Sequence, residues 1–313
     1  MSSPDSISAS IIICTHNRCA LLENLITSLC GQSYPPDAYE VIFVDNASTD
    51  DTRTKIECLI EQSAHPIRYI YEPQLGVSNA RNQGAAVANG EIFAYIDDDA
   101  IPEPDWLAKL VDGLTSKQDI VCVGGKIDLM WDVPRPDWMP KELEGYLGDN
   151  TQWGDICREL DKSPHEGNMA AWRWAIQAAG GFDTRFGGVG NKLGRNEGPR
   201  LYELLRRQGK ILYTPDAVVH HRVPAVRATK RYLIRLGFFQ GIANGNLSFL
   251  GHPRSRIGLI RSFLADIKFL AQEAAMMIQS WLQKDQRKAF ANRVFMIIRL
   301  GQMWQTLRLV FRV

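Results

Sequence analysis

The chain has 313 residues, of which 45% are hydrophobic and 23% charged, and its formal net charge at pH 7 is +1. This composition is typical of a globular protein, and the near-neutral charge argues against nucleic acid as a partner. The length suits one large domain, or one domain with an appendage.

The sequence predicts neither a signal peptide nor a membrane-spanning helix. No stretch of about 20 apolar residues is free of charge, so no membrane-spanning helix is predicted. The first residues, MSSPDSISAS, lack the basic and apolar regions of a signal peptide. The six cysteines form no CxxC pair, which favours free thiols in a reducing compartment over a zinc site. The cytoplasm is therefore the expected location.

The N-terminal part alternates short apolar runs with helical patterns. Predicted strands cover residues 11–14, 40–46, 67–71 and 92–96. Predicted helices lie between them, around residues 21–29, 56–60 and 76–89. This alternation predicts a mainly parallel sheet with helices on both faces, in which ligands bind at the carboxyl ends of the strands.

After residue 114 the alternation loosens. Residues 121–130 are a predicted strand, residues 131–155 an irregular loop, residues 167–179 a helix and residues 180–194 a mobile glycine-rich segment. Residues 199–207 are a predicted short helix, followed by two short strands, 211–213 and 217–219, around a Pro-Asp turn. From Thr229 onward nearly all of the chain is predicted to be helical.

Three consecutive aspartates, Asp97, Asp98 and Asp99, follow the fourth predicted strand. Carboxylates this close repel one another unless positive charge lies among them. Capping of the next helix would use one of them but hardly all three. Mg²⁺ or Mn²⁺, held by one or two carboxylates and by phosphate oxygens, is the favoured interpretation.

Other polar residues lie at the same predicted edge of the sheet. Thr15 and Asn17 end the first predicted strand and Arg18 begins a helix, as in many phosphate sites, although Asn17 fits a plain N-cap equally well. Asp45 suits either a hydrogen bond to a base or ribose, or an Asx turn. Arg81 has the charge to reach a phosphate, but a lone arginine is more often solvated.

Two further positions carry chemistry. Glu197 begins a helix, where a carboxylate serves either as a general base or as a favourable charge at the helix N-terminus. His220 and His221 end a strand, where an imidazole is either a metal ligand or an ordinary polar side chain.

Together these segments resemble the family 2 glycosyltransferases, a family of inverting enzymes with the GT-A fold. The matching segments are SIIICTHNR, EVIFVDNASTDDT, GVSNARNQGAAVANGEIFAYIDDDAIPEPDWL, GNMAAWRWAIQAAGGFDTRFG and LLRRQGKILYTPDAVVHHRVP. They occur in the family's order and cover roughly residues 8–225. The resemblance implies an α/β fold with a mainly parallel, twisted sheet flanked by helices.

The resemblance also implies roles for individual residues. Asp97 and Asp99 match the two acids of the DxD motif that holds Mn²⁺ or Mg²⁺ against the donor diphosphate, with His221 favoured over His220 as a further ligand. The donor is a nucleotide sugar of the UDP, GDP or dTDP type. The residues that the resemblance places against it are Thr15, Asn17, Arg18, Asp45, Arg81, Asp97, Asp98, Gly167 and Asn168.

One departure from the family pattern concerns the catalytic base. The family places an acidic pair at the start of the helix before the LRRxG segment, and the second acid is the usual base. Here the helix begins Asn196-Glu197-Gly198-Pro199, and the leucines that follow align the second position with Gly198. Glu197 is then the best nearby carboxylate, with Asp183 as a less favoured substitute.

The domain organisation follows from these matches. Residues 1–226 are the predicted GT-A catalytic domain, and residues 227–313 are a helical C-terminal extension. From Lys284 to the end there are seven basic residues and one acid, Asp285. The helices either pack on another part of the protein or a second subunit, or lie on anionic lipid. We favour the membrane surface, because many related transferases use lipid-linked acceptors.

The sequence therefore predicts a metal-dependent, inverting glycosyltransferase of polysaccharide or glycan assembly, acting on a glycan or lipid-linked acceptor. A sugar nucleotidyltransferase is the nearest alternative, but that class has a glycine-rich N-terminal loop where this chain has THNR. A non-catalytic nucleotide-sugar binding protein is the other alternative, because the second acid is missing.

Overall fold

The computed structural model describes residues 8–187, 196–251 and 256–310. The chain forms two compact units. The first comprises residues 8–130, 150–185 and 197–222, and the second the described parts of 131–149, 186–196 and 223–313. The predicted domain boundary after residue 226 stays a prediction. The predicted glycine-rich segment, residues 180–194, lies partly outside the described residues, as does most of the N-terminal stretch examined for a signal peptide.

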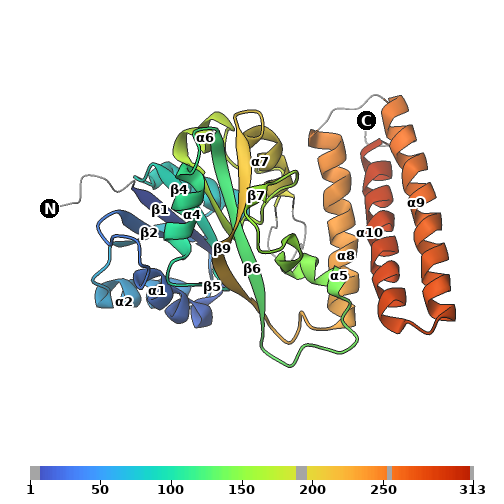
Figure 1. Cartoon of the computed structure of the whole chain (residues 1–313), viewed down its shortest axis with the longest axis horizontal. Helices are drawn as coiled ribbons and strands as arrows, with labels where there is room; N and C mark the ends of the chain where they lie inside the picture. The colour runs from blue at the N-terminus through green and yellow to red at the C-terminus, as the bar shows by residue number, and fades with distance from the viewer. Residues whose placement is uncertain (1–7, 188–195, 252–255, 311–313) are drawn as a thin grey trace. The chain divides into compact units, whose positions relative to one another are not determined.

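The first unit is built on one sheet, in which the described strands follow the order β3-β2-β1-β4-β8-β6-β9-β5, with β7 beside β9 (Figure 1). The four N-terminal strands are parallel: β1 (Ala9–Thr15), β2 (Tyr39–Asp45), β3 (Ile67–Tyr71) and β4 (Ile92–Asp97). β1, β2 and β4 are almost wholly buried, as expected of strands covered on both faces, whereas β3, at the end of the sheet, is mostly half-buried. The predicted parallel core of the sheet is thereby confirmed.

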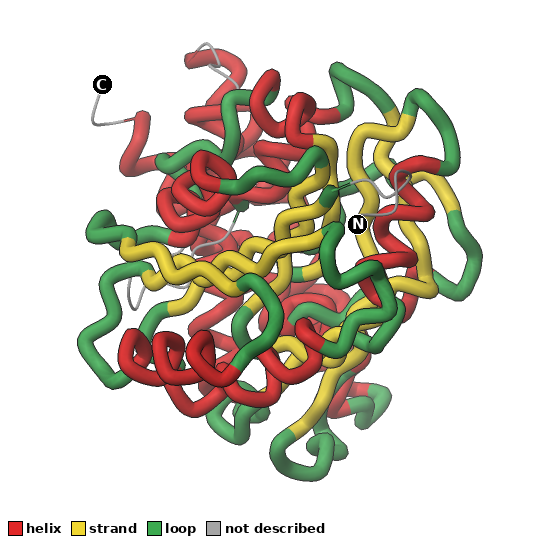
Figure 2. Tube along the Cα trace, turned by 90° about the vertical axis from the view of Figure 1, so that its left-hand side faces the viewer, coloured by secondary structure: helices red, strands yellow, loops and turns green. Residues whose placement is uncertain are grey.

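The other strands extend the sheet with antiparallel pairs. They are β5 (Ala100–Pro102), β6 (Ile120–Trp131), β7 (Arg158–Glu159), β8 (Asn168–Trp172) and β9 (Lys210–Val223). β8 lies between β4 and β6 and runs antiparallel to both, and β9 pairs antiparallel with β5 and β7. The fold is thus a mixed, mostly parallel sheet flanked by helices, and the strands run through the middle of this unit in Figure 2.

Helices cover both faces of the sheet. They are α1 (Leu22–Cys30), α2 (Thr52–Gln62), α3 (Val77–Val87), α4 (Trp106–Thr115), α6 (Arg173–Ala178) and α7 (Glu197–Leu205). Alternate residues of β1 point to opposite faces: Ile11 packs in a core with α1 and α4, and Ile12 in a second core with α3, α6 and α7. Short 3₁₀ turns occupy Cys19–Leu21 and Thr151–Trp153.

Three predicted elements differ from the structure. Residues 167–179 are not one helix, because the first part forms β8 and only Arg173–Ala178 is helical. The two strands predicted around Pro215 are a single strand, β9. Proline is compatible with an extended chain, and β9 is held by β7 and β5 at its two ends. The loop predicted over residues 131–155 contains α5 (Lys141–Glu144) and the 3₁₀ turn Gly145–Leu147.

The second unit is dominated by three helices, α8 (Lys230–Asn246), α9 (Arg256–Leu282) and α10 (Gln286–Val310), with a π-helical turn at Leu247–Gly251. Thr229 caps α8 by accepting a hydrogen bond from the Tyr232 amide. α8 and α10 lie backbone to backbone: a Cβ on Gly241 would fall 2.0 Å from the Ile298 carbonyl oxygen. The predicted helical C-terminus is confirmed, and no described helix has the length and apolarity needed to cross a membrane.

The register of β4 against β1 yields a stability prediction. Gly90 precedes β4, and a Cβ there would lie 2.6 Å from the Ala9 carbonyl carbon and the Ser10 nitrogen. Backbone cannot move aside cheaply, so Gly90→Ala is expected to lower the free energy of unfolding by about 1–3 kcal/mol in a urea titration. Gly31→Ala is the matched control, since its nearest atom is 3.4 Å away. Equal losses in both variants would contradict this.

Candidate functional site

Polar side chains meet at the carboxyl ends of β1, β2 and β4 in the first unit. β1 ends at Thr15, β2 at Asp45 and β4 at Asp97, and the parallel registers bring these ends to one edge. This edge is where the sequence predicted a ligand site, and the structure brings the three aspartates and both candidate arginines together there.

Arg18 supplies positive charge to two of the aspartates. Its Nη1 lies 2.9 Å from Asp99 Oδ2 and 3.7 Å from Asp98 Oδ1. The Thr15 hydroxyl donates a 2.8 Å hydrogen bond to Asp98 Oδ2. Burial raises the pKa of Asp98 to about 7, although Arg18 and Thr15 act in the opposite direction. Arg18 thus contacts the acidic residues in this structure, whereas the resemblance placed it along the nucleoside.

Arg81, on α3, connects Asp97 to Glu197. Its Nη2 lies 3.4 Å from Asp97 Oδ1 and its Nη1 3.1 Å from Glu197 Oε1, while its guanidinium lies over the Phe182 ring. The arginine is 5% exposed, so it is not solvated, although a lone arginine in a sequence more often is. Burial alone would lower its pKa, but the charges of Glu197 and Asp97 outweigh that effect and raise it.

A set of candidate metal ligands lies at the same edge. Ligand atoms of Asp97, Asp99 and His221 all lie within 4.8 Å of one another. The His221 Nε2 atom is 3.1 Å from Asp99 Oδ1, and within the described chain its buried Nδ1 has no hydrogen-bond partner. Two carboxylates and an imidazole are ligand types that suit Mn²⁺. These residues therefore fit the metal that the resemblance implies.

Strand pairing decides which of the two histidines joins this set. β5 pairs with β9 so that Ala100 lies opposite His221, and the Arg222 amide donates to the Asp99 carbonyl oxygen. His220 instead contacts Glu103. The geometry thus agrees with the preference for His221.

The predicted nucleoside residues also make contacts within the protein. Asp45 accepts hydrogen bonds from the Tyr69 hydroxyl at 2.8 Å and from the Ser48 amide at 2.9 Å, the second of which fits the Asx-turn interpretation. Asn17, in the left-handed region at φ 54°, accepts a 2.7 Å hydrogen bond from the Thr49 amide through its side chain. Asn17 thereby ties the loop after β1 to the loop after β2 and is no N-cap here.

Gly167 precedes β8 and Asn168 is its first residue, next to the acidic edge. A Cβ on Gly167 would lie 2.3 Å from Asp97 Oδ2, so any side chain would displace that carboxylate. Asn168 is fully buried; its amide accepts from the Trp106 indole and donates to the carbonyl oxygens of Lys126 and Ala217. The structure therefore gives Asn168 a role in fixing β8, and its predicted contact with the donor stays a prediction.

Glu166 is a residue that the sequence interpretation missed. Its Oε1 lies 1.0 Å from the point that a Cβ on Gly198 would occupy. Burial, reinforced by the charge of Glu197, raises the pKa of Glu166 to about 7. Its sequence signal is slight: it is one acid immediately before the matched GNMA segment, far along the chain from the helix where an acid was expected.

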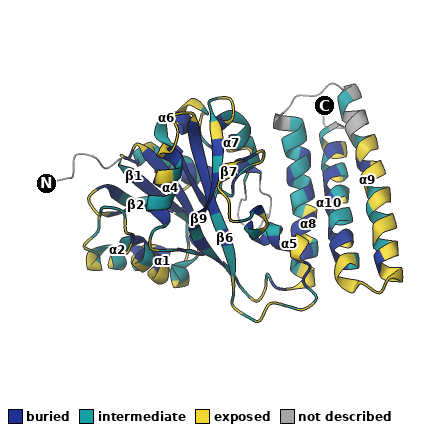
Figure 3. Ribbon diagram, viewed as in Figure 1, coloured by how far each residue is buried: buried dark blue, intermediate teal, exposed yellow. Residues whose placement is uncertain are grey.

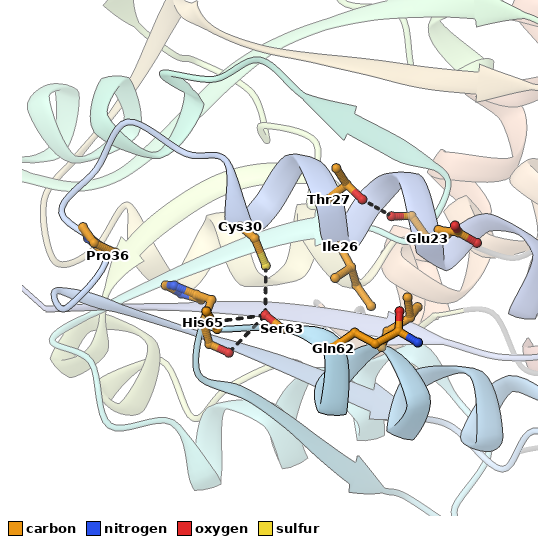
Figure 4. A pocket seen from close by; sticks show the side chains of 10 residues that line it. Glu23, Ile26, Thr27, Cys30, Pro36, Gln62, Ser63 and His65 are labelled. Carbon is orange, nitrogen blue, oxygen red and sulfur yellow. Dashed lines mark hydrogen bonds between the residues drawn. The ribbon is translucent and has the colours of Figure 1, made fainter.

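A separate groove is formed by α1, the end of α2 and the residues between α2 and β3 (Figure 4). Its volume is about 480 Å³, and its lining includes Cys30, Ser63 and His65, with Cys30 and Ser63 in hydrogen-bond contact at 3.5 Å. None of the residues of the acidic edge lines it. We therefore do not regard this groove as the functional site.

Comparison with solved structures agrees with this fold. The mannosyltransferase PcManGT from Pyrobaculum calidifontis, in complex with GDP-Man and Mn²⁺, superimposes with a TM-score of 0.66 at 19% sequence identity, covering 96% of this chain and 88% of that one. At this identity the likeness concerns the fold, which is the GT-A fold of nucleotide-sugar glycosyltransferases.

Comparison with sequences points to glycosyltransferases. Residues 10–157 match the family model "Glycosyl transferase family 2", and together with the relatives below this match shows that the chain is a glycosyltransferase similar to that family. A glucosyl-dolichyl phosphate glucuronosyltransferase of Haloferax volcanii is 27% identical over 77% of each chain. The succinoglycan biosynthesis protein ExoM of Rhizobium meliloti is 26% identical over 78% of this chain and 76% of its own length. The alternative of a sugar nucleotidyltransferase is thereby set aside.

The buried position of Arg81 yields a second prediction. Arg81→Met would leave two carboxylates without their shared cation, and we expect a loss of about 3–5 kcal/mol in the free energy of unfolding. Arg53→Met is the matched control, because Arg53 forms an exposed ion pair with Glu57 on α2 and its loss should cost at most about 1 kcal/mol. Urea denaturation at neutral pH measures both, and similar losses would show that Arg81 is not a structural cation.

Proposed function

We propose that this glycosyltransferase moves a sugar from a UDP-, GDP- or dTDP-type donor to a hydroxyl of a glycan or lipid-linked acceptor, with inversion, in polysaccharide or glycan assembly. The observation that carries the proposal is the convergence of Asp97, Asp99 and His221 at the carboxyl edge of the sheet. The similarity to a glucuronosyltransferase for glucosyl-dolichyl phosphate and to a succinoglycan biosynthesis protein supports the acceptor class.

A divalent cation, Mn²⁺ or Mg²⁺, is part of this proposal. Asp97, Asp99 and His221 would hold it, and it would neutralise charge on the leaving nucleoside diphosphate. The local charge favours such an ion: carboxylates of Asp97, Asp98, Asp99 and Glu197 lie around the two guanidinium groups of Arg18 and Arg81. The Mn²⁺ in the structurally similar mannosyltransferase supports the choice of metal.

The chain's own residues would then bind and orient the donor. Asp45 retains lone pairs for a base or ribose, because each of its oxygens accepts a single described hydrogen bond. Thr15 and Asn17 would line the nucleoside, and Asp98 the ribose. Arg18 and Arg81 would act by fixing the aspartates that they contact, while Gly167 would leave room for the donor beside Asp97.

The acceptor hydroxyl must lose a proton as it attacks the anomeric carbon, and a carboxylate on the far side of the sugar is suited to take it. Glu197 is the predicted base. Its carboxylate is buried and lies 3.1 Å from Arg81 Nη1.

Donor and metal binding are tested together by thermal shift. A ligand that binds only the native state at a hundredfold excess over Kd adds about 2.7 kcal/mol of stability. We expect one of UDP-, GDP- or dTDP-sugars to raise the Tm by several degrees with Mn²⁺ and by less without it. Asp99→Asn should remove the Mn²⁺-dependent part, because it removes a charged ligand.

Asp119→Asn serves as the control for that experiment, since Asp119 pairs with Lys210 away from the acidic edge. A full Mn²⁺-dependent shift in Asp99→Asn would contradict the metal assignment. No shift of the wild type with any of these donors, with or without Mn²⁺, would contradict the proposed function.

We also propose that the chain works in the cytoplasm, with its C-terminal helices on anionic membrane. The end of α9 and the start of α10 border an apolar groove of about 730 Å³, lined by Ile278, Trp281 and Leu282 among others, and Trp281 is 73% exposed. Lys284 and Arg293 line the same groove. Exposed apolar side chains beside basic ones suit a lipid interface, and Figure 3 shows how much of α9 is exposed.

Vesicle co-sedimentation tests this contact. Wild-type protein should bind phosphatidylcholine vesicles that contain phosphatidylglycerol more strongly than pure phosphatidylcholine. Replacing Trp281 and Leu282 by serine should weaken binding by about tenfold or more, because two large apolar side chains no longer enter the interface. Trp174→Ser is the control, an exposed tryptophan on α6. Unchanged binding of the double variant would refute the contact.

A further inference from the structure

Glu166 lies at the acidic edge without belonging to the ion network there. It precedes Gly167, whose absent Cβ would lie 2.3 Å from Asp97 Oδ2, so the chain passes directly beside that carboxylate. The residue itself is of intermediate burial, so part of Glu166 is exposed.

The carboxylate of Glu166 reaches the first turn of α7. A Cβ built on Gly198 would meet Glu166 Oε1 at 1.0 Å and its carboxyl carbon at 2.1 Å. These distances are far inside van der Waals contact, so the carboxylate fills the space in which a side chain at position 198 would begin. Glu166, in the loop before β8, thus places a carboxylate beside Gly198, the position on α7 where the family has an acid.

The neighbouring carboxylates are already bound to cations. Asp97 and Glu197 share Arg81, and Asp98 and Asp99 share Arg18. Over residues 8–187, 196–251 and 256–310, by contrast, no salt bridge engages Glu166, and its carboxylate accepts a hydrogen bond from its own backbone amide. A carboxylate has lone pairs for about four hydrogen bonds, so Glu166 keeps one that can take a proton.

We propose that Glu166 is the general base of the transfer reaction, standing in for the side chain missing at Gly198, and that Glu197 is a positioning residue that holds Arg81. This inference rests on the proposed function. The acceptor O–H bond breaks and its proton passes to a Glu166 carboxylate oxygen. The acceptor oxygen bonds to the anomeric carbon as the bond from that carbon to the diphosphate oxygen breaks, and the electron pair leaves with the nucleoside diphosphate.

The surroundings of Glu166 suit this role. Burial and the charge of Glu197 raise its pKa to about 7, with a smaller contribution from Asp97 in the same direction and an opposing one from Arg81. A base is most effective when its pKa lies near the working pH. The ionised, proton-accepting fraction of Glu166 therefore increases as the pH rises through neutrality.

The test is nucleotide release from UDP-, GDP- and dTDP-sugars with Mn²⁺, where water or an added acceptor takes the sugar. Glu166→Gln should lower kcat by about 10²–10⁴-fold, the usual contribution of general base catalysis. The Tm shift given by nucleotide and Mn²⁺ should persist in this variant. The exchange variant, Glu166→Gly with Gly198→Glu, should recover at least tenfold over Glu166→Gln, because it returns a carboxylate to the same space from α7.

Two outcomes would overturn the inference while leaving the proposed function intact. One is a Glu166→Gln enzyme that keeps more than about a third of wild-type kcat. The other is a folded exchange variant that is no faster than Glu166→Gln. Failure of the proposed function looks different: the wild type would release no nucleotide and show no nucleotide-dependent Tm shift.

The position of the Glu166 carboxylate can be tested without an enzyme assay, by comparing the Tm of two pairs of variants. Gly198→Ala should lower the Tm of the otherwise unchanged protein by about one or two degrees, because the new Cβ meets Glu166 Oε1 and the flexible end of that side chain must move aside. The same substitution in a Glu166→Gly background should lower it little or not at all. Equal effects in both backgrounds would show that Glu166 does not occupy the space beside Gly198.

Discussion

Repulsion among buried carboxylates is the constraint on which this site depends. Three aspartates end one strand, and each must be balanced by positive charge drawn from elsewhere in the chain. Arg18 and Arg81 do this, one from the loop after β1 and the other from α3. Since both arginines contact two carboxylates each, this edge is held together by ion pairs in the absence of any ligand, and a divalent cation at the proposed site would add to an existing network.

The topology explains why these groups can meet. Parallel strands bring the ends of β1, β2 and β4 to one edge, and the antiparallel strands β8 and β9 then return to that edge with Glu166, Gly167 and His221. One half of the candidate site therefore comes from parallel strands that end at this edge, and the other half from the start of β8 and from His221 near the end of β9. The candidate site is thus built from segments that are distant in sequence.

Much of this was accessible from the sequence. Apolar runs located the parallel strands to within a residue or two, and the aspartates at the end of β4 indicated a candidate cation site, because local pattern determines both. The strand β8 was missed because its alanine-rich run also fits a helix, and only its neighbours β4 and β6 decide the matter. The sequence could not predict the internal hydrogen bonds of Asp45 and Asn168, or the contact of Glu166 with α7, because these depend on how distant segments pack in the fold.

The short strand β5 has a consequence for how the chain tolerates changes of length. It is three residues long, and it is flanked by two carboxylates, Asp99 and Glu103, that contact the consecutive histidines His221 and His220 of β9. Side chains alternate between faces along a strand, so an insertion or deletion of one residue within β5 would prevent Asp99 and Glu103 from keeping both contacts at once. A substitution there would change one side chain, whereas a change of length would disturb the contacts of both carboxylates with the histidines of β9.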